Sequence, residues 1–584
     1  MENTLAPDIP DIQFRPMDEY LVRFVQLHET FRLPELQALA DFHGIEMEVV
    51  DYRASSPFAI IRLPSPTAAR QLISRSILSL SISHLWGHAT SYTTLHTQLQ
   101  ATKSHLWPPY HLSPFRFNID TFQSKRSHSA KTALINSFSY MDLQGPIRPF
   151  DESVPTFVIS EEFEVYGPPP KSNANTESSS GTKENDRQPL RVFLSLHLAD
   201  SGRAAVTTYD LKKRTYISTT SMDAELSLIS ANLALAGPGR VVYDPFCGTG
   251  SFLVAAAHFG ASVVGSDLDG RVVRGRIRES RQGVRVGGKR WVRERKMADA
   301  KGEGGGKGGE KEEGGEQEGG GEKKDGKEVK ETKGEEKGER SVRGNLRQYG
   351  LEQRWLDGFV SDLTNSPVRI GGFGQESGRW IDAIVCDPPY GVREGLKVLG
   401  SHKPELQEEV IMKDGSPAHL SPGYIPPKRP YSFDAMLADI LTFAANVLVD
   451  SGRLCMWVPV ENVDEEGDTG AKDVGIPTHP CLRLCSVSTQ EFTRWSRRLI
   501  VYARLPDRDI DGPALKQYEA MRKDKLEKGT ADELNEFRKR FFEGFRPQSG
   551  SSTPIETMTE QSLPTRVKPE NTDAKMPSRE GSIS

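Results

Sequence analysis

The chain has 584 residues, enough for several domains, and only 36% of them are hydrophobic, with 52 glycines and 38 prolines. This composition predicts a mixture of folded and disordered segments. The net charge of −5 averages over unevenly spread charges and identifies no class of partner. Five cysteines without a CxxC pair predict reduced thiols and a cytoplasmic location. No apolar run approaches about 18 residues, which argues against a membrane span, and the acidic N-terminus is unlike a signal peptide.

Two α+β units are predicted before residue 200. The first, residues 1–110, is ferredoxin-like, and the second covers residues 111–200. The expected elements are strands at 20–27, 58–63, 115–122, 156–159 and 191–198, helices at 33–42, 66–77 and 131–140, and a loop at 167–188. Basic Lys125, Arg126 and Lys131 accompany aromatic residues in the second unit, which fits a solvated surface and an RNA contact equally well.

A βαβ unit is predicted within the next domain, residues 201–505. A helix at 219–236, capped by Ser221 or a neighbouring threonine, precedes a short buried strand at 241–243. Residues 244–250 then form a glycine loop that leads into a helix at 252–259, and a strand from 262 ends at Asp267. The glycines let the backbone approach a ligand, and Asp267 can accept hydrogen bonds from a ribose diol. The G-x-G-x-x-G spacing of dinucleotide folds is absent.

A long insertion separates this unit from the next predicted strand. Residues 271–296 carry eleven Lys and Arg residues, which fit contact with nucleic-acid phosphates or a solvated lead-in to a linker. Residues 297–342 are dominated by Gly, Glu and Lys, a composition that cannot bury a core and predicts disorder.

The rest of the domain is predicted to complete a seven-stranded, mostly parallel α/β sheet. The expected elements are helices at 345–356 and 433–449, the latter capped by Ser432, and strands at 359–362, 381–386, 453–458, 482–487 and 498–503. C-terminal helices follow at 511–527 and 530–545 within residues 506–546, with a Thr530/Glu533 capping box, and residues 547–584 are predicted to be a disordered tail.

Asp387, Pro388, Pro389 and Tyr390 follow directly after the buried strand at 381–386. Two prolines cannot continue a central strand, because each lacks the N–H of the ladder and fixes φ. The chain must therefore leave the sheet at the carboxyl end of a strand, where open α/β sheets bind ligands.

The four residues 387–390 suit methylation of an exocyclic amine. Such an amine is a poor nucleophile because its lone pair is delocalised into the ring, so acceptors for its N–H groups must turn the lone pair toward the donor methyl. The Asp387 side chain and the Pro388 carbonyl can be those acceptors, and Tyr390 can stack on the base. Positioning and electrostatics then supply the acceleration, with no metal ion and no covalent nucleophile. Cys247 and Cys386 are interpreted as packing residues.

Five segments resemble the catalytic subunits of eukaryotic, fungal-like tRNA guanine-10 N2-methyltransferases. They are residues 211–217 (LKKRTYI), 220–228 (TSMDAELSL), 244–253 (DPFCGTGSFL), 265–269 (GSDLD) and 387–395 (DPPYGVREG). The resemblance spans roughly residues 10–505. It implies a Rossmann-like class I fold, a tRNA substrate and S-adenosyl-L-methionine as cofactor. Residues 136–140 and 143–145 resemble part of a THUMP RNA-binding domain. The family also works with a small zinc-binding activator subunit.

The resemblance also implies roles for individual residues. Phe246, Gly248, Gly250 and Asp244 should line the cofactor, Asp267 with the adjoining Leu268 should hold its ribose, and Asp362 should face its adenine amine. Arg393 should meet a substrate phosphate, although a surface ion pair with Glu394 also fits its position.

Three other functions remain open at the level of sequence. An N6-adenine DNA or RNA methyltransferase uses the same four residues as 387–390. A non-catalytic RNA-binding subunit would keep the fold but not the cofactor. A protein glutamine methyltransferase would favour Asn over Asp at position 387.

Overall fold

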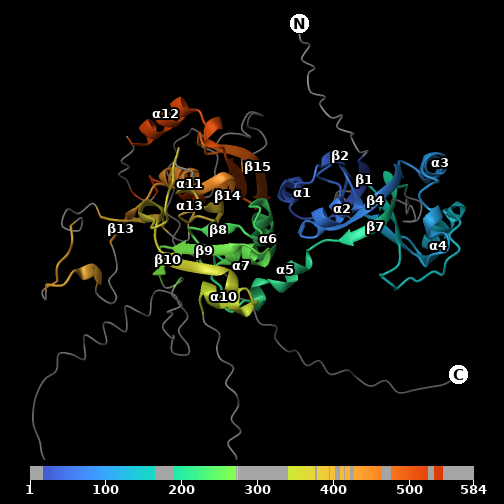
Figure 1. The fold of residues 1–584 in the computed structure, drawn as a ribbon, viewed down its shortest axis with the longest axis horizontal. Helices are drawn as coiled ribbons and strands as arrows, with labels where there is room; N and C mark the ends of the chain where they lie inside the picture. The colour runs from blue at the N-terminus through green and yellow to red at the C-terminus, as the bar shows by residue number, and fades with distance from the viewer. Residues whose placement is uncertain are drawn as a thin grey trace, which may run out of the picture.

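The protein folds around two seven-stranded sheets and a small two-stranded one (Figure 1). This computed structural model describes residues 17–164, 188–270, 273, 340–374, 378–392, 395–401, 408–412, 415–420, 427–462, 475–523, 530 and 532–543. The loop at 167–188, the basic run, the insertion and the tail expected from the sequence therefore lie outside the described residues, apart from a few positions at their edges.

The N-terminal sheet has the strand order β2-β3-β1-β4-β7-β6-β5. β5 and β6 are parallel and the other pairs are antiparallel. Its elements are β1 Asp18–Phe24, α1 Glu29–His43, β2 Glu48–Tyr52, β3 Phe58–Leu63, α2 Pro66–Ile73, β4 Ser79–Ala89, α3 Tyr92–Thr102, β5 Arg116–Phe122, α4 His128–Asn136, β6 Thr156–Glu162 and β7 Arg191–Asp200. Strands from both predicted α+β units thus share one sheet, and the central strand β4 was not predicted.

The second sheet has the order β10-β9-β8-β11-β14-β16-β15, and the predicted seven-stranded, mostly parallel α/β sheet is confirmed. β10, β9, β8, β11 and β14 are parallel, and β16 runs antiparallel to both of its neighbours. The strands are β8 Val241–Asp244, β9 Ser262–Asp267, β10 Trp355–Val360, β11 Ile381–Cys386, β14 Leu448–Glu461, β15 Leu482–Glu491 and β16 Trp495–Arg504. The small sheet pairs β12 Lys397–Leu399 with β13 Lys428–Pro430.

Helices cover the second sheet and follow it toward the C-terminus (Figure 1). They are α5 Ala204–Thr208, α6 Ala224–Leu233, α7 Ser251–His258, α10 Val342–Gln348, α11 Phe433–Val447, α12 Gly512–Lys523 and α13 Glu536–Glu543. Ser432 caps α11 as predicted, accepting from Ala435 N. None of the helices in the described part of the chain is long and apolar enough to cross a membrane.

Several predicted boundaries were wrong because tertiary contacts decide them. Asp223 caps α6, since the Ser221 hydroxyl instead bonds Thr249 at 2.6 Å. The helix expected at 345–356 ends at Gln348, and Trp355 already lies in β10. The helices expected at 66–77, 131–140 and 530–545 are α2, α4 and α13, with the shorter or shifted bounds given above. The predicted capping box at Thr530 forms, but in the turn before α13.

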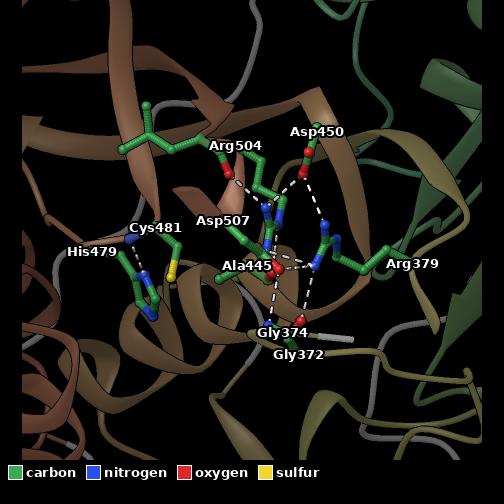
Figure 2. A network of polar contacts seen from close by, with 10 residues as sticks. Gly372, Gly374, Arg379, Ala445, Asp450, His479, Cys481, Arg504 and Asp507 are labelled. Carbon is green, nitrogen blue, oxygen red and sulfur yellow. Dashed lines mark hydrogen bonds and ion pairs between the residues drawn. The ribbon is translucent and has the colours of Figure 1, made fainter. Parts of the chain in front are cut away.

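A buried ion-pair network fixes the chain where it leaves the second sheet (Figure 2). Arg504, at the end of β16, donates to Asp450 at 2.8 Å and to Asp507 at 2.5 Å. Arg379 donates to the same two carboxylates at 2.9 and 3.0 Å. Because each acid is shared by two guanidinium groups, the segment that leads into α12 is held against β14 and the loop before β11.

A second polar cluster joins the two large sheets through α1 and α6. The Asn232 side chain donates to Glu35 at 2.8 Å and to the Arg75 carbonyl at 2.9 Å, and it accepts from Arg75 Nε at 3.0 Å. Glu35 is fully buried and also accepts from Ile77 N and Leu78 N. Burial raises the pKa of Glu35, although these donors oppose the rise. The cluster therefore sets how the N-terminal sheet sits against the second one.

Replacing Asn232 with alanine should destabilise the protein by about 1–3 kcal/mol, the usual cost of leaving buried polar groups unsatisfied. Urea denaturation followed by circular dichroism measures the change. Gln37→Ala, at an exposed position of α1, is the control and should stay within about 0.5 kcal/mol of the wild type. Equal stability of the wild type and Asn232→Ala would show that the junction does not depend on this side chain.

Candidate active site

Three carboxylates meet at the carboxyl edge of the second sheet. Asp244 ends β8, Asp267 ends β9 and Asp387 follows β11, and these strands are adjacent and parallel. Burial raises the pKa of Asp244 well above its ordinary value, and the neighbouring charges of Asp267 and Asp387 raise it further. Asp244 therefore lies close enough to Asp267 and Asp387 for both of their charges to affect it.

The glycine loop between β8 and α7 lies against this edge. Gly248, with φ +48°, donates its N–H to Asp267 Oδ2 at 3.0 Å. Gly250 has φ +80°, and a Cβ there would lie 2.6 Å from the Val342 side chain, so no larger residue fits. A Cβ at Gly248 would meet nothing closer than a carbonyl at 3.9 Å, which leaves open space beside the loop. Phe246 and Leu268 are partly exposed next to it.

Residues 387–390, here called the proline turn, carry the second half of the site. The Tyr390 hydroxyl donates to the Asp387 carboxylate, and both side chains are partly exposed. Burial raises the pKa of Asp387 to about 6, although the Tyr390 hydrogen bond and the nearby Arg497 charge lower it. Burial and the Asp387 charge also raise the pKa of Tyr390 well above 10. At neutral pH the pair is therefore mainly a carboxylate and a neutral phenol.

Two residues of β16, Trp495 and Arg497, belong to the site and were missed by the sequence analysis. The Trp495 and Tyr390 rings meet edge to face with centroids 6.2 Å apart. Arg497 donates to Gln490 at 2.6 Å, and its guanidinium lies 4.9 Å from the centre of the Trp457 ring. Period-two alternation places Trp495 and Arg497 on the same face of β16. That spacing was visible in the sequence, but nothing local ties it to residues 387–390.

The other predicted site residues lie near this edge or outside the described chain. The carboxylate of Asp362, just after β10, accepts from Asn365 N at 2.8 Å and from Leu399 N at 2.7 Å, so it ties the turn after β10 to strand β12. Burial raises the thiol pKa of Cys247 and Cys386 well above the ordinary value, which agrees with their interpretation as packing residues. Arg393 and Glu394 lie outside the described residues.

The arrangement suits a particular kind of ligand. Three carboxylates cluster here, and the pKa values of two of them, Asp244 and Asp387, are raised. Such a cluster favours a cationic group, because the positive charge relieves the repulsion between the acids. The open space at Gly248 and the acid that ends β9 fit a ribose that approaches the loop backbone. Asp387 and Tyr390 offer a hydrogen-bond acceptor and an aromatic ring beside this edge.

Two family models divide the chain in the same way as its two large sheets. The Tmrp11 THUMP N-terminal domain matches residues 18–203, and the RMKL-like methyltransferase domain matches residues 212–400. Together with the strand order and the glycine loop, these matches define a class I methyltransferase with a THUMP-related N-terminal domain.

The particular family follows from full-length relatives. The chain is 34% identical to the tRNA (guanine(10)-N(2))-methyltransferase of Saccharomyces cerevisiae over 83% of this chain and 93% of that protein. Identity is 30% to the enzyme of the same name from Schizosaccharomyces pombe, over 84% of this chain and 90% of the relative. Identity to the Homo sapiens enzyme is also 30%, over 84% of this chain and 89% of that relative. The chain belongs to the tRNA (guanine(10)-N(2))-methyltransferase family, and it is an enzyme of tRNA methylation.

A solved structure, TrmN from Thermus thermophilus, aligns with 83% of this chain and all of its own length at 14% identity and a TM-score of 0.34. At that score the alignment adds nothing to the fold assignment, which the sheet order and the family models supply.

Replacing Arg497 with methionine should raise the pKa of Asp387 above its value of about 6, because a neighbouring positive charge is lost. Carbon-13 titration of selectively labelled aspartate carboxyls measures this pKa. Arg498→Met, one residue along β16 and on the opposite face, is the control and should leave the titration unchanged. An unaltered or lowered pKa in Arg497→Met would refute the electrostatic contact.

Proposed function

We propose that this enzyme transfers a methyl group from S-adenosyl-L-methionine to the exocyclic N2 of guanosine 10 in tRNA. The observation that carries the proposal is the pairing of an acid-rich cofactor edge with the Asp387–Tyr390 turn. The names of the relatives supply the base and its position. An N6-adenine methyltransferase shares the proline turn, and the identity of the methylated base separates the two.

The cofactor half of the site is proposed to consist of Asp244, Asp267 and the glycine loop. S-adenosyl-L-methionine supplies, when bound, an activated methyl group on a positively charged sulfonium. Asp267 accepts hydrogen bonds from the ribose diol, and the backbone at Gly248 and Gly250 comes close enough to line the cofactor. Phe246 and Leu268 add apolar contact from either side of the loop. Asp244 contributes negative charge beneath it.

Asp362 is proposed to face the adenine amine. Its carboxylate already accepts two backbone N–H groups, so it would act from a fixed position. This role stays a prediction.

The substrate half is proposed to act by holding the guanine amine. The Asp387 carboxylate and the Pro388 carbonyl accept the two N–H groups, which turns the nitrogen lone pair out of conjugation. Pro389 keeps the turn rigid, because its ring fixes φ. The Tyr390 ring stacks on the base. Asp387, with a pKa of about 6, is mostly ionised at neutral pH and can also take up the proton that the amine releases.

The remaining assignments concern partners. The THUMP-related domain is proposed to grip the tRNA, and Arg393 to meet one of its phosphates. A small zinc-binding activator subunit is proposed to cover apolar surface of the methyltransferase domain. Edge strand β10 supports this, since Leu356 is 52% exposed and Val360 38% exposed. The cytoplasmic location stays a prediction.

Replacing Asp387 with alanine should lower methyl transfer to tRNA by at least about 100-fold, the lower end for a lost proton acceptor. Labelled S-adenosyl-L-methionine, transcribed tRNA with and without guanosine 10, and nucleoside analysis measure both rate and product. For the wild type the rate should fall as the pH drops through about 6, when Asp387 is protonated. Asp509→Ala, at an exposed position, is the control. Full transfer by Asp387→Ala would refute the proposal, and N6-methyladenosine as product would favour the alternative.

Replacing Asp267 with alanine should weaken cofactor binding about 10- to 100-fold, because hydrogen bonds to a charged group contribute roughly 1.5–3 kcal/mol. Isothermal titration calorimetry with S-adenosyl-L-methionine measures the affinity. Asp357→Ala, at an exposed site on β10, should bind like the wild type. Unchanged affinity in Asp267→Ala would remove this residue from the cofactor site, and no binding by the wild type would favour a non-catalytic RNA-binding subunit.

A further inference from the structure

The C-terminal segment of the described chain returns to the proline turn. After α12 the chain reaches α13, which lies beside β14 (Figure 1). Asn535, the residue before α13, donates from Nδ2 to the Tyr390 carbonyl at 3.0 Å. The Arg538 guanidinium donates to the next carbonyl, that of Gly391. Two side chains from one short segment therefore bind the last backbone carbonyl of the turn and the carbonyl that follows it.

The Asn535 side chain also caps helix α13. Its Oδ1 accepts from Arg538 N at 2.9 Å, which is the usual hydrogen bond of a helix N-cap. The acceptor end of this amide therefore starts α13, while the donor end holds the turn. Because the two ends do different work, a substitution can remove one and leave the other.

The contact between α13 and the turn is closely fitted. Asn535 is only 3% exposed and Phe537 only 8% exposed. The Phe537 ring meets those of Tyr390 and Trp495 edge to face, with centroids 6.5 and 5.8 Å apart. Gly391 has φ +81°, and a Cβ there would lie 2.5 Å from Asn535 Nδ2. Only glycine therefore permits this approach.

The segment braces the turn and leaves the site open. Its polar contacts go to the backbone carbonyls of Tyr390 and Gly391. Asp387 and Tyr390 remain partly exposed residues while α13 is in place. A lid over the base would instead cover these two side chains.

We propose that Asn535 is a positioning residue for methyl transfer, which holds the proline turn so that Asp387, Pro388 and Tyr390 keep their orientation. The inference rests on the proposed function of that turn. Arg538 and Phe537 assist by fixing the adjacent carbonyl and the Tyr390 ring. Misplacement of reacting groups by about 1 Å can cost up to 100-fold in rate, so loss of one brace should be visible in kcat.

Two substitutions separate positioning from helix stability. Asn535→Ser and Asn535→Asp both keep a good N-cap acceptor for Arg538 N. Neither retains the amide donor to Tyr390 O, and the aspartate adds charge repulsion toward that carbonyl. A residue that only starts α13 would tolerate both changes.

The assay uses the full chain with labelled S-adenosyl-L-methionine and transcribed tRNA. We expect kcat to fall about tenfold in Asn535→Ser and further in Asn535→Asp. Cofactor affinity should stay unchanged, and the melting temperature should fall only slightly, because the Tyr390 carbonyl loses its partner. Arg538→Gln removes the second contact, the hydrogen bond to the Gly391 carbonyl, and should also lower kcat. Lys539→Ala, at an exposed position on the same helix, is the matched control and should behave like the wild type.

The outcomes distinguish this inference from the proposed function beneath it. If both Asn535 variants keep full kcat while Asp387→Ala loses it, the positioning role is overturned and the function stands. Higher kcat in the Asn535 variants would also overturn it, because the segment would then obstruct the site. If Asp387→Ala is fully active, the proposed role of the turn in methyl transfer is refuted, and the positioning role of Asn535 is refuted with it. If the Asn535 variants lose melting temperature in proportion to their loss of kcat, Asn535 has a structural role only, and the positioning role is overturned.

Discussion

The crowding of carboxylates at one sheet edge is the constraint on which the site depends. Asp244, Asp267 and Asp387 end or follow adjacent strands, so the sheet itself forces like charges together. Burial and repulsion both raise the pKa of Asp244. Backbone donors such as Gly248 N offset part of this cost. The proposed cofactor carries a positively charged sulfonium, which would relieve the remaining repulsion.

Elements outside the parallel strands tune this edge. The reversed strand β16 brings Arg497, whose charge lowers the pKa of Asp387 against the effect of burial. Elsewhere in the domain, Asn232 on α6 bonds Glu35 of α1 and Arg75, which follows α2. In the methyltransferase domain, Arg497 thus lowers the pKa of Asp387, and Asn232 links the domain to the THUMP-related domain by hydrogen bonds. Both place functional groups by contacts that the parallel strands alone do not provide.

Local signals predicted the parts of the fold that local physics decides. The strand Ile381–Cys386 was predicted with its observed bounds, because an apolar run followed by two prolines can end in only one way. The cap of α11 at Ser432 was equally local. The α6 cap was wrongly assigned to Ser221 or a neighbouring threonine, because the hydrogen bond between the Ser221 and Thr249 hydroxyls forms only in the folded chain. The alternating strand β4 lacked a strong apolar run and was overlooked.

By itself, the sequence determined the fold class and the acids, glycines and proline turn of the site. These follow from short-range rules: strand ends, backbone freedom at glycine, and the missing N–H of proline. Only the tertiary structure decided that the Arg497 charge lowers the pKa of Asp387 and that Asn535 holds the Tyr390 carbonyl. Both lie more than a hundred residues from position 387, and no pattern within one segment specifies a contact across that distance. Folding alone brings such residues together.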